Sequence, residues 1–245
     1  MKILAIDSSG LVASVAVVEE NNLIAEYTMN YKKTHSQTLL PMLDEVKKMT
    51  DLDLTSIDAV AVAAGPGSFT GLRIGSATAK GLGLALGKPI IPVPTVDALA
   101  YNLYGTDRII CPIMDARREQ VYTGIYHFEA TGEYNFAYKL HILEKQCAVS
   151  IYEIAEKLNV LCQELGKEVL FLGDGVPVFE ERLKELMQVP YSFAPAHMNR
   201  QRAASLAVLA AIYYEEGRVE TAAEHAPDYL RLSQAERELA EKNGQ

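Results

Sequence analysis

Hydrophobic positions along the chain predict an alternation of short strands and helices. Continuous or alternating apolar runs of five to eight residues are typical of strands, whereas apolar residues three and four positions apart predict amphipathic helices. The first part of the chain reads as strand, strand, strand, helix, strand, helix. We predict strands at 2–7, 13–19, 23–30 and 59–64, and helices at 35–50 and 69–86.

The same order of elements recurs after a bridge at residues 90–104. Ser150 and Glu153 form a capping box that opens one of the later helices. Such a recurrence predicts an α/β protein of two related lobes, each a mixed sheet with helices. We place the N-terminal lobe at 1–104 and the C-terminal lobe at 105–245, with an alternative in which the last helices, about 200–245, pack back on the first lobe. The later predicted elements are strands 108–115, 120–128, 137–143 and 168–173, and helices 150–165, 178–187, 200–217 and 235–242.

Composition restricts the classes of partner. The chain has 245 residues, 49% of them hydrophobic, and a formal net charge of -9. An acidic chain repels a phosphate backbone at long range, so the chain alone is a poor candidate for binding nucleic acid. Three cysteines without a CxxC pair favour reduced thiols. No apolar run is long enough for a membrane span, and we expect a cytoplasmic protein with no membrane partner.

Two lobes imply a cleft between them, where ligands usually bind. In each lobe the first strand ends at an aspartate before a turn, at Asp7 and at Asp115. Turn amides there are suited to a phosphate and a carboxylate to a magnesium-bound water, while an Asp7 that only caps its turn is the alternative. Two arginines crowd the second turn. The candidate residues of this nucleotide cleft are Asp7, Ser8, Ser9, Asp115, Gly173 and Gly175.

A glycine-rich junction lies between the strand at 59–64 and the helix at 69–86. Gly65-Pro66-Gly67-Ser68 leads into the helix, but no Walker lysine follows. Gly71, Gly75, Ala79 and Gly83 then recur every four residues, so they form one ridge. Each interior glycine costs about 1 kcal/mol relative to alanine, so a close packing partner is expected. Either the lobe's own sheet or a helix of a second chain satisfies that expectation.

Metal and hydrolase chemistry find no support in the residue pattern. No two of the five histidines are three or four residues apart, and no GxSxG sequence occurs. We therefore predict no metal site and no catalytic nucleophile.

The segment 65–75, GPGSFTGLRIG, together with residues 1–9 and 88–93, resembles the TsaB (YeaZ) family. Residues 227–231 and 235–236 continue the resemblance weakly. The resemblance implies an actin-like fold of the sugar-kinase and Hsp70 type. It also implies a non-catalytic subunit that scaffolds and activates the paralogous TsaD subunit, which transfers threonylcarbamoyl to adenosine 37 of tRNA.

Partners and cofactors follow from the same resemblance. It implies a heterodimer with a TsaD-type paralogue, a TsaE-type ATPase that joins it, a homodimer when the chain is alone, and tRNA only within the complex. ATP and a divalent metal are expected on the partner subunits, and none on this chain. TsaD-type relatives carry two metal-binding histidines at the positions of Thr95 and Leu99, neither of which suits a metal here. Contact of Arg117, Arg118 or the C-terminal tail with tRNA or TsaE is left open.

The resemblance further implies that the two first-lobe helices pair with the partner subunit. A self-complementary face also permits a homodimer. Two alternatives remain: a small-molecule ATP-dependent kinase of the same fold, and a metalloprotease-like protein. The predicted interface residues are Leu39, Met42, Leu43, Val46, Gly71, Arg73, Gly75 and Ala79.

Overall fold

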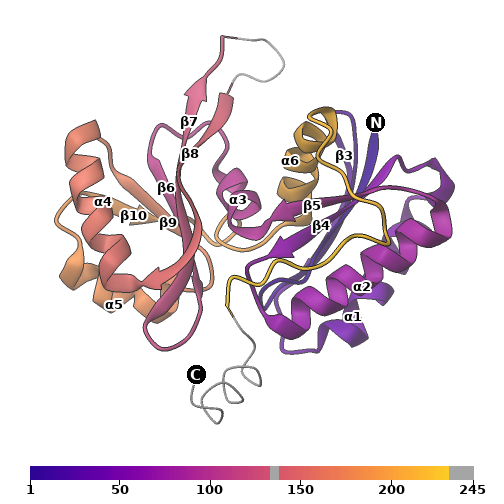
Figure 1. The fold of residues 1–245 in the computed structure, drawn as a ribbon, viewed down its shortest axis with the longest axis horizontal. Helices are drawn as coiled ribbons and strands as arrows, with labels where there is room; N and C mark the ends of the chain where they lie inside the picture. Colours follow the sequence, from indigo (N-terminus) through magenta and orange to yellow (C-terminus); the bar gives the residue numbers. More distant parts are fainter. Residues whose placement is uncertain (133–137, 232–245) are drawn as a thin grey trace.

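Two five-stranded mixed sheets form the framework of the molecule. Its computed structural model describes residues 1–132 and 138–231. Figure 1 shows the sheets side by side as the centres of two lobes. The first sheet has the order β3-β2-β1-β4-β5. Its strands are β1 (Lys2–Asp7), β2 (Ala13–Glu19), β3 (Asn22–Met29), β4 (Ala59–Gly65) and β5 (Ile90–Pro94).

The second sheet repeats this topology. Read from the opposite edge, its order is β8-β7-β6-β9-β10, and both sheets have two antiparallel pairings followed by two parallel ones. The structure thus confirms the two-lobed fold, with a mixed sheet and helices in each lobe. The strands are β6 (Ile109–Asp115), β7 (Gln120–Ala130), β8 (Tyr138–Ser150), β9 (Val169–Leu172) and β10 (Tyr191–Phe193).

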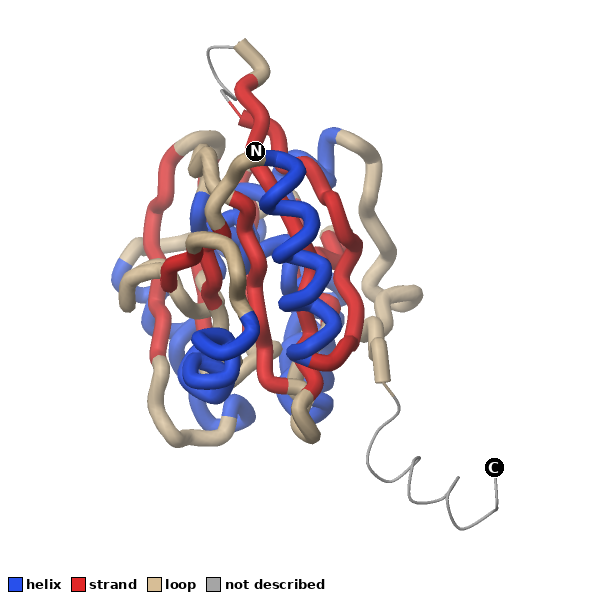
Figure 2. The backbone as a smooth tube through the Cα atoms, turned by 90° about the vertical axis from the view of Figure 1, so that its left-hand side faces the viewer, coloured by secondary structure: helices blue, strands red, loops and turns tan. Residues whose placement is uncertain are grey.

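Helices cover the outer face of each sheet. Outside the first sheet lie α1 (His35–Met49) and α2 (Phe69–Leu86), and outside the second lie α4 (Ile151–Leu165) and α5 (Val176–Leu186). Figure 2, which views the molecule from the second lobe's side, shows helices in front of the strands. The Ser150 hydroxyl accepts a hydrogen bond from the Glu153 amide at 3.1 Å, which confirms the predicted cap of α4.

A third helical layer lies between the two sheets. It consists of α3 (Thr95–Ala100) and α6 (Ala203–Glu215), as Figure 1 shows. α6 is apolar on nearly all sides, as expected for a helix that is mostly buried, and Val208 and Tyr214 are its exposed apolar residues. One buried cluster runs from Ala61 in the first sheet through Leu206 of α6 to Met114 and Phe128 in the second. The two lobes therefore share a hydrophobic core, and α6 packs against the first sheet.

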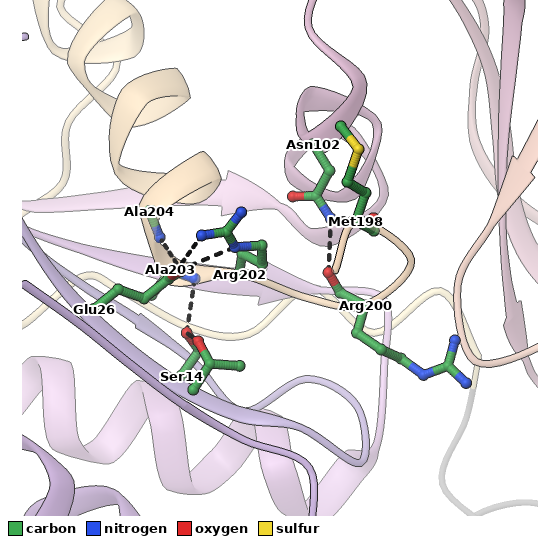
Figure 3. A network of polar contacts seen from close by, with 9 residues as sticks. Ser14, Glu26, Asn102, Met198, Arg200, Arg202, Ala203 and Ala204 are labelled. Atoms are coloured by element: carbon green, nitrogen blue, oxygen red, sulfur yellow. Dashed lines mark hydrogen bonds and ion pairs between the residues drawn. The ribbon is translucent and has the colours of Figure 1, made fainter. Parts of the chain in front are cut away.

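Polar contacts fix the segment that returns from the second lobe to the first. Figure 3 shows the Glu26 carboxylate at the start of α6, where it accepts from the Ala204 amide at 3.1 Å and pairs with Arg202. The Ser14 hydroxyl accepts from the Ala203 amide at 2.9 Å. These side chains of β2 and β3 satisfy the free amides of the first turn of α6. The negative charge also lies at the positive end of the helix dipole.

The structure departs from the predicted elements at a few places. The bridge at 90–104 contains β5 and α3, and the three-residue strand β10 was missed. α1 begins at His35, as predicted, with Thr34 as its N-cap, and it contains Pro41. β8 extends to Ser150, beyond the predicted end at residue 143. The predicted helix 235–242 lies outside the described residues.

Candidate functional site

A cleft of about 1150 Å³ opens between the two lobes. Its first-lobe wall comes from the turn after β1, the β3–α1 loop and the start of α2. Its second-lobe wall comes from the turn after β6 and the start of α5, and residues 228–231 complete the lining. Both candidate phosphate turns thus lie at the cleft, as the sequence predicts.

The first-lobe turn is folded in on itself. Asp7, Ser8 and Ser9 are all buried. The Asp7 carboxylate accepts from the Ser9 amide at 2.9 Å and from the Ser9 hydroxyl at 2.6 Å. Burial is the main influence on Asp7 and raises the pKa of its carboxyl from 3.8 to about 6, against the hydrogen bonds from Ser9, which lower it. Asp7 therefore caps its own turn, the alternative that the sequence left open.

The glycine-rich junction packs directly on this turn. The Ser68 amide donates to the Ser9 carbonyl at 2.7 Å, and the Ser8 hydroxyl donates to the Gly71 carbonyl at 2.9 Å. A Cβ on Gly67 would stand 2.3 Å from the Ser9 carbonyl oxygen, and one on Gly71 would stand 2.0 Å from that of Ser8. These glycines bring the start of α2 against the carbonyl oxygens of the turn in its own lobe.

The second-lobe turn has an equivalent arrangement. Asp115, Gly173 and Gly175 each follow Asp7, Gly65 and Gly67 by 108 residues. A Cβ on Gly173 would stand 2.1 Å from the Ile113 carbonyl oxygen, and the Gly175 amide donates to that same oxygen at 2.9 Å. Both glycines are therefore used to pack against β6, and the Gly175 amide is not free for a phosphate.

Charged side chains close the rest of this turn. The Asp115 carboxylate accepts from the Arg117 amide at 2.8 Å and pairs with the Arg117 guanidinium at 3.2 Å. Arg117, Arg118 and Glu119 all have positive φ, between 56° and 66°, a left-handed turn without glycine. Asp174 lies beside it and accepts from the Asp115 amide at 3.3 Å, and burial raises the pKa of the Asp174 carboxyl. The expected crowding of this turn is present.

The residues predicted to line a partner interface lie instead inside the first lobe. The four predicted side chains of α1 pack in the core beneath that helix, and Gly71, Gly75 and Ala79 face the lobe's own turn and sheet. Only Arg73 among the eight is exposed. The choice of residues is therefore corrected, because the apolar stripe of each helix is used by its own sheet. The buried members are Leu39, Met42, Leu43, Val46, Gly71, Gly75 and Ala79.

The positions compared with the metal-binding histidines are also core positions. Thr95 and Leu99 lie in α3 and are fully buried in the shared core. Within residues 1–132 and 138–231, no group of three or more His, Cys, Asp or Glu side chains is placed to hold a metal ion. Asp97, which lies between Thr95 and Leu99 in α3, accepts hydrogen bonds from the hydroxyls of Tyr126, at 2.7 Å, and Tyr213, at 3.2 Å. This segment joins the lobes through a buried polar contact.

Residues 218–231 form an extended strap that the sequence analysis missed. Glu220 pairs with Ile90 at the free edge of β5, and Lys80 of α2 donates to the carbonyl of His225 at 2.7 Å. The Asp228 amide then donates to the Ala64 carbonyl at 2.7 Å. A Cβ on Gly65 would stand 2.1 Å from the Asp228 carbonyl oxygen, so this glycine is required by the strap.

The end of the strap reaches the cleft and touches both lobes. The Tyr229 ring lies 4.7 Å from that of Phe69, and its hydroxyl accepts from Arg73 at 3.3 Å. Arg231 donates to the Ala116 carbonyl of the second lobe. Residues 227–231 belong to the resemblance noted in the sequence. Their contact partners are more than a hundred residues away, so no local sequence pattern predicts these contacts.

The chain is similar to known proteins over nearly its full length. A family model described as TsaD, tRNA N6-adenosine threonylcarbamoyltransferase, matches residues 22–239. The Bacillus subtilis protein named tRNA threonylcarbamoyladenosine biosynthesis protein TsaB is 35% identical over 239 residues, with 96% of each chain covered. The chain belongs to the TsaB family. The TsaB protein of Escherichia coli is 30% identical over 246 residues, covering 99% of this chain and 100% of that one.

Solved structures agree with membership in the TsaB family. YeaZ from Pseudomonas aeruginosa matches with a TM-score of 0.76 at 26% identity, over 94% of this chain and 99% of that one. The resemblance noted in the glycine-rich segment is thereby confirmed, together with the actin-like fold that it implied. No helix in the described part of this TsaB chain is long and apolar enough to cross a membrane.

Proposed function

We propose that this TsaB chain is a non-catalytic subunit in the biosynthesis of tRNA threonylcarbamoyladenosine. It scaffolds and activates a TsaD-type subunit, which carries out the transfer, and a TsaE-type ATPase joins the assembly. ATP and the divalent metal belong to those partner subunits. The names of the full-length relatives support the pathway, and the geometry of the cleft supports the non-catalytic role.

One observation supports the non-catalytic role: the carboxylate of the first phosphate turn is buried and engaged within the protein. A kinase of this fold needs free turn amides and an accessible carboxylate at that place. Here Asp7 is buried and bonded to Ser9, and Gly67 and Gly71 lie against the carbonyls of the same turn. This arrangement favours the scaffold over the kinase alternative.

The outer face of α1 and α2 is the surface that we assign to the TsaD-type partner. We define it by the exposed residues Leu40, Ala77, Gly81 and Leu84. Leu40 is 56% exposed and Leu84 66% exposed, while Gly81 has open space around its Cα. The TsaD family model matches this chain across both helices, so the partner has counterparts of them. Equivalent faces pair readily about a pseudo-twofold axis, which also permits a homodimer when the partner is absent.

The test is co-purification with a TsaD-type subunit, followed by measurement of threonylcarbamoyladenosine formation in the reconstituted system. Leu84→Glu places a charge on the outer face and is expected to abolish both co-purification and product formation. Val160→Glu, at a 55% exposed position of α4 in the other lobe, is the matched control and is expected to change neither. Normal co-purification of Leu84→Glu would refute the assigned surface. The kinase alternative predicts tight ATP binding by the isolated chain, and calorimetry that detects no binding would exclude that alternative.

A further inference from the structure

We propose that the cleft between the lobes binds a single-stranded stretch of RNA, with phosphates held by Lys32 and Lys33. The inference rests on the proposed function, in which the RNA available to this chain is the substrate tRNA. The charges, the aromatic side chains and the size of the cleft support this proposal.

Positive side chains line both walls of the cleft, although the chain as a whole carries a net charge of -9. Lys32 and Lys33 come from the β3–α1 loop of the first lobe, and Arg117 comes from the second. Both lysines are exposed, and neither ammonium group forms an ion pair with another described residue. Lysines that bind phosphates are usually free of protein carboxylates in this way. Arg231, from the strap, adds a fourth cation at the junction of the lobes.

The carboxylates that line the cleft are already engaged. Asp115 pairs with Arg117, and Asp228 accepts from the Gln146 amide at 3.4 Å. Asp174 is half-buried and accepts from the Asp115 amide at 3.3 Å. The free charge that a ligand meets at the first-lobe wall is therefore positive.

Aromatic side chains lie among these cations. Tyr31 is next to Lys32, is 68% exposed, and has no ring contact with another described aromatic residue. Phe69 and Tyr229 form a second aromatic site on the cleft, with the Arg73 guanidinium 4.1 Å from the Phe69 ring centre. A cationic groove with exposed rings is the usual arrangement for single-stranded nucleic acid, because phosphates pair with the cations and bases stack on the rings.

The size of the cleft favours a polymer over a small molecule. Its volume of about 1150 Å³ exceeds the roughly 300–1,000 Å³ that is typical of small-molecule sites. The Asp7 carboxylate and the Gly175 amide, which would select a nucleotide triphosphate in these turns, are already bonded within the protein. An extended ligand that crosses the mouth of the cleft needs neither turn.

The experiment measures the affinity of the assembled complex for a tRNA transcript as a function of salt. Each single-strand phosphate contact contributes about 0.7 to the slope of log affinity against log salt. Lys32→Glu combined with Lys33→Glu is therefore expected to reduce the slope by about 1.4. The matched control is Lys139→Glu combined with Lys145→Glu, which makes the same change in net charge on the exposed surface of β8 and is expected to leave the slope unchanged.

A second pair of variants tests stacking separately from charge. Tyr31→Ala is expected to weaken binding without changing the salt slope, and Tyr31→Phe is expected to retain the affinity. Co-purification with the TsaD-type subunit is measured in parallel, so that a failed assembly is distinguished from a failed RNA contact. Equal slopes for the cleft and control variants would overturn the proposal. So would loss of co-purification by the cleft variant with an unchanged RNA affinity per assembled complex, since the cleft would then hold a protein segment.

Discussion

Gly71 and Gly81 of α2 provide a direct test of why this helix contains glycine. Both positions have ordinary helical φ, so alanine is conformationally permitted at each. In helix interiors, alanine is favoured over glycine by about 1 kcal/mol. That gain is the same at both positions, and the difference between the two variants therefore reports only what each Cβ meets.

At Gly81 a Cβ meets nothing within 4 Å, whereas at Gly71 it would stand 2.0 Å from the Ser8 carbonyl oxygen. A backbone carbonyl cannot rotate away as a side chain does, so the turn must move by about 1.4 Å to reach ordinary contact at 3.4 Å. Overpacking of this kind costs about 1–3 kcal/mol. We expect Gly81→Ala to raise the melting temperature by about 2–4 °C for a chain of this length. The same conversion predicts that Gly71→Ala lowers it by up to about 8 °C, if the upper end of that cost applies.

The assay is thermal unfolding of both variants, followed by circular dichroism under identical conditions. Gly81→Ala is the matched control, because it has the same chemical change in the same helix. An equal rise in melting temperature for both variants would show that α2 does not press on the turn after β1. The proposed explanation for the closed phosphate site would then fail with it.

Two further predictions concern buried charge. Burial raises the pKa of the Asp7 carboxyl from 3.8 to about 6, so the folded state keeps this proton to a higher pH than the unfolded state. The free energy of unfolding therefore falls by about 3 kcal/mol as the pH rises from below 4 to above 6. Urea unfolding at pH 4 and pH 7 should show this loss in the wild type and not in Asp7→Asn; an equal pH dependence would contradict it. Glu26→Gln removes the charge at the start of α6 and should cost about 2 kcal/mol in unfolding free energy, whereas Glu19→Gln, in an exposed pair with Lys2, should cost little; equal losses would exclude the capping role.

The sequence predicts the local elements well, because their signals are local. The strands Lys2–Asp7 and Ala13–Glu19 have the predicted bounds, and the Ser150 cap lies within three residues of its partner. The repeated order of elements also predicts the two lobes. By contrast, the Glu26 contact with Arg202 joins residues 176 positions apart, and no spacing or composition signals it. β10 is too short, at three residues, for any periodicity to appear.

The glycine-rich junction shows the limit of the sequence at the candidate site itself. A glycine between a strand and a helix indicates that something approaches the backbone closely, but it does not indicate what approaches. In this chain the approaching groups are the Ser8 and Ser9 carbonyls and, at Gly65, the Asp228 carbonyl. The strap that supplies Asp228 is distant in sequence, so the sequence predicts a close packing partner without identifying it. Gly173 is the equivalent glycine of the second lobe, and the Ile113 carbonyl approaches it in the same way. The packing of each lobe on itself therefore explains these glycines, and the outer helices and the mouth of the cleft are the surfaces that we propose for binding.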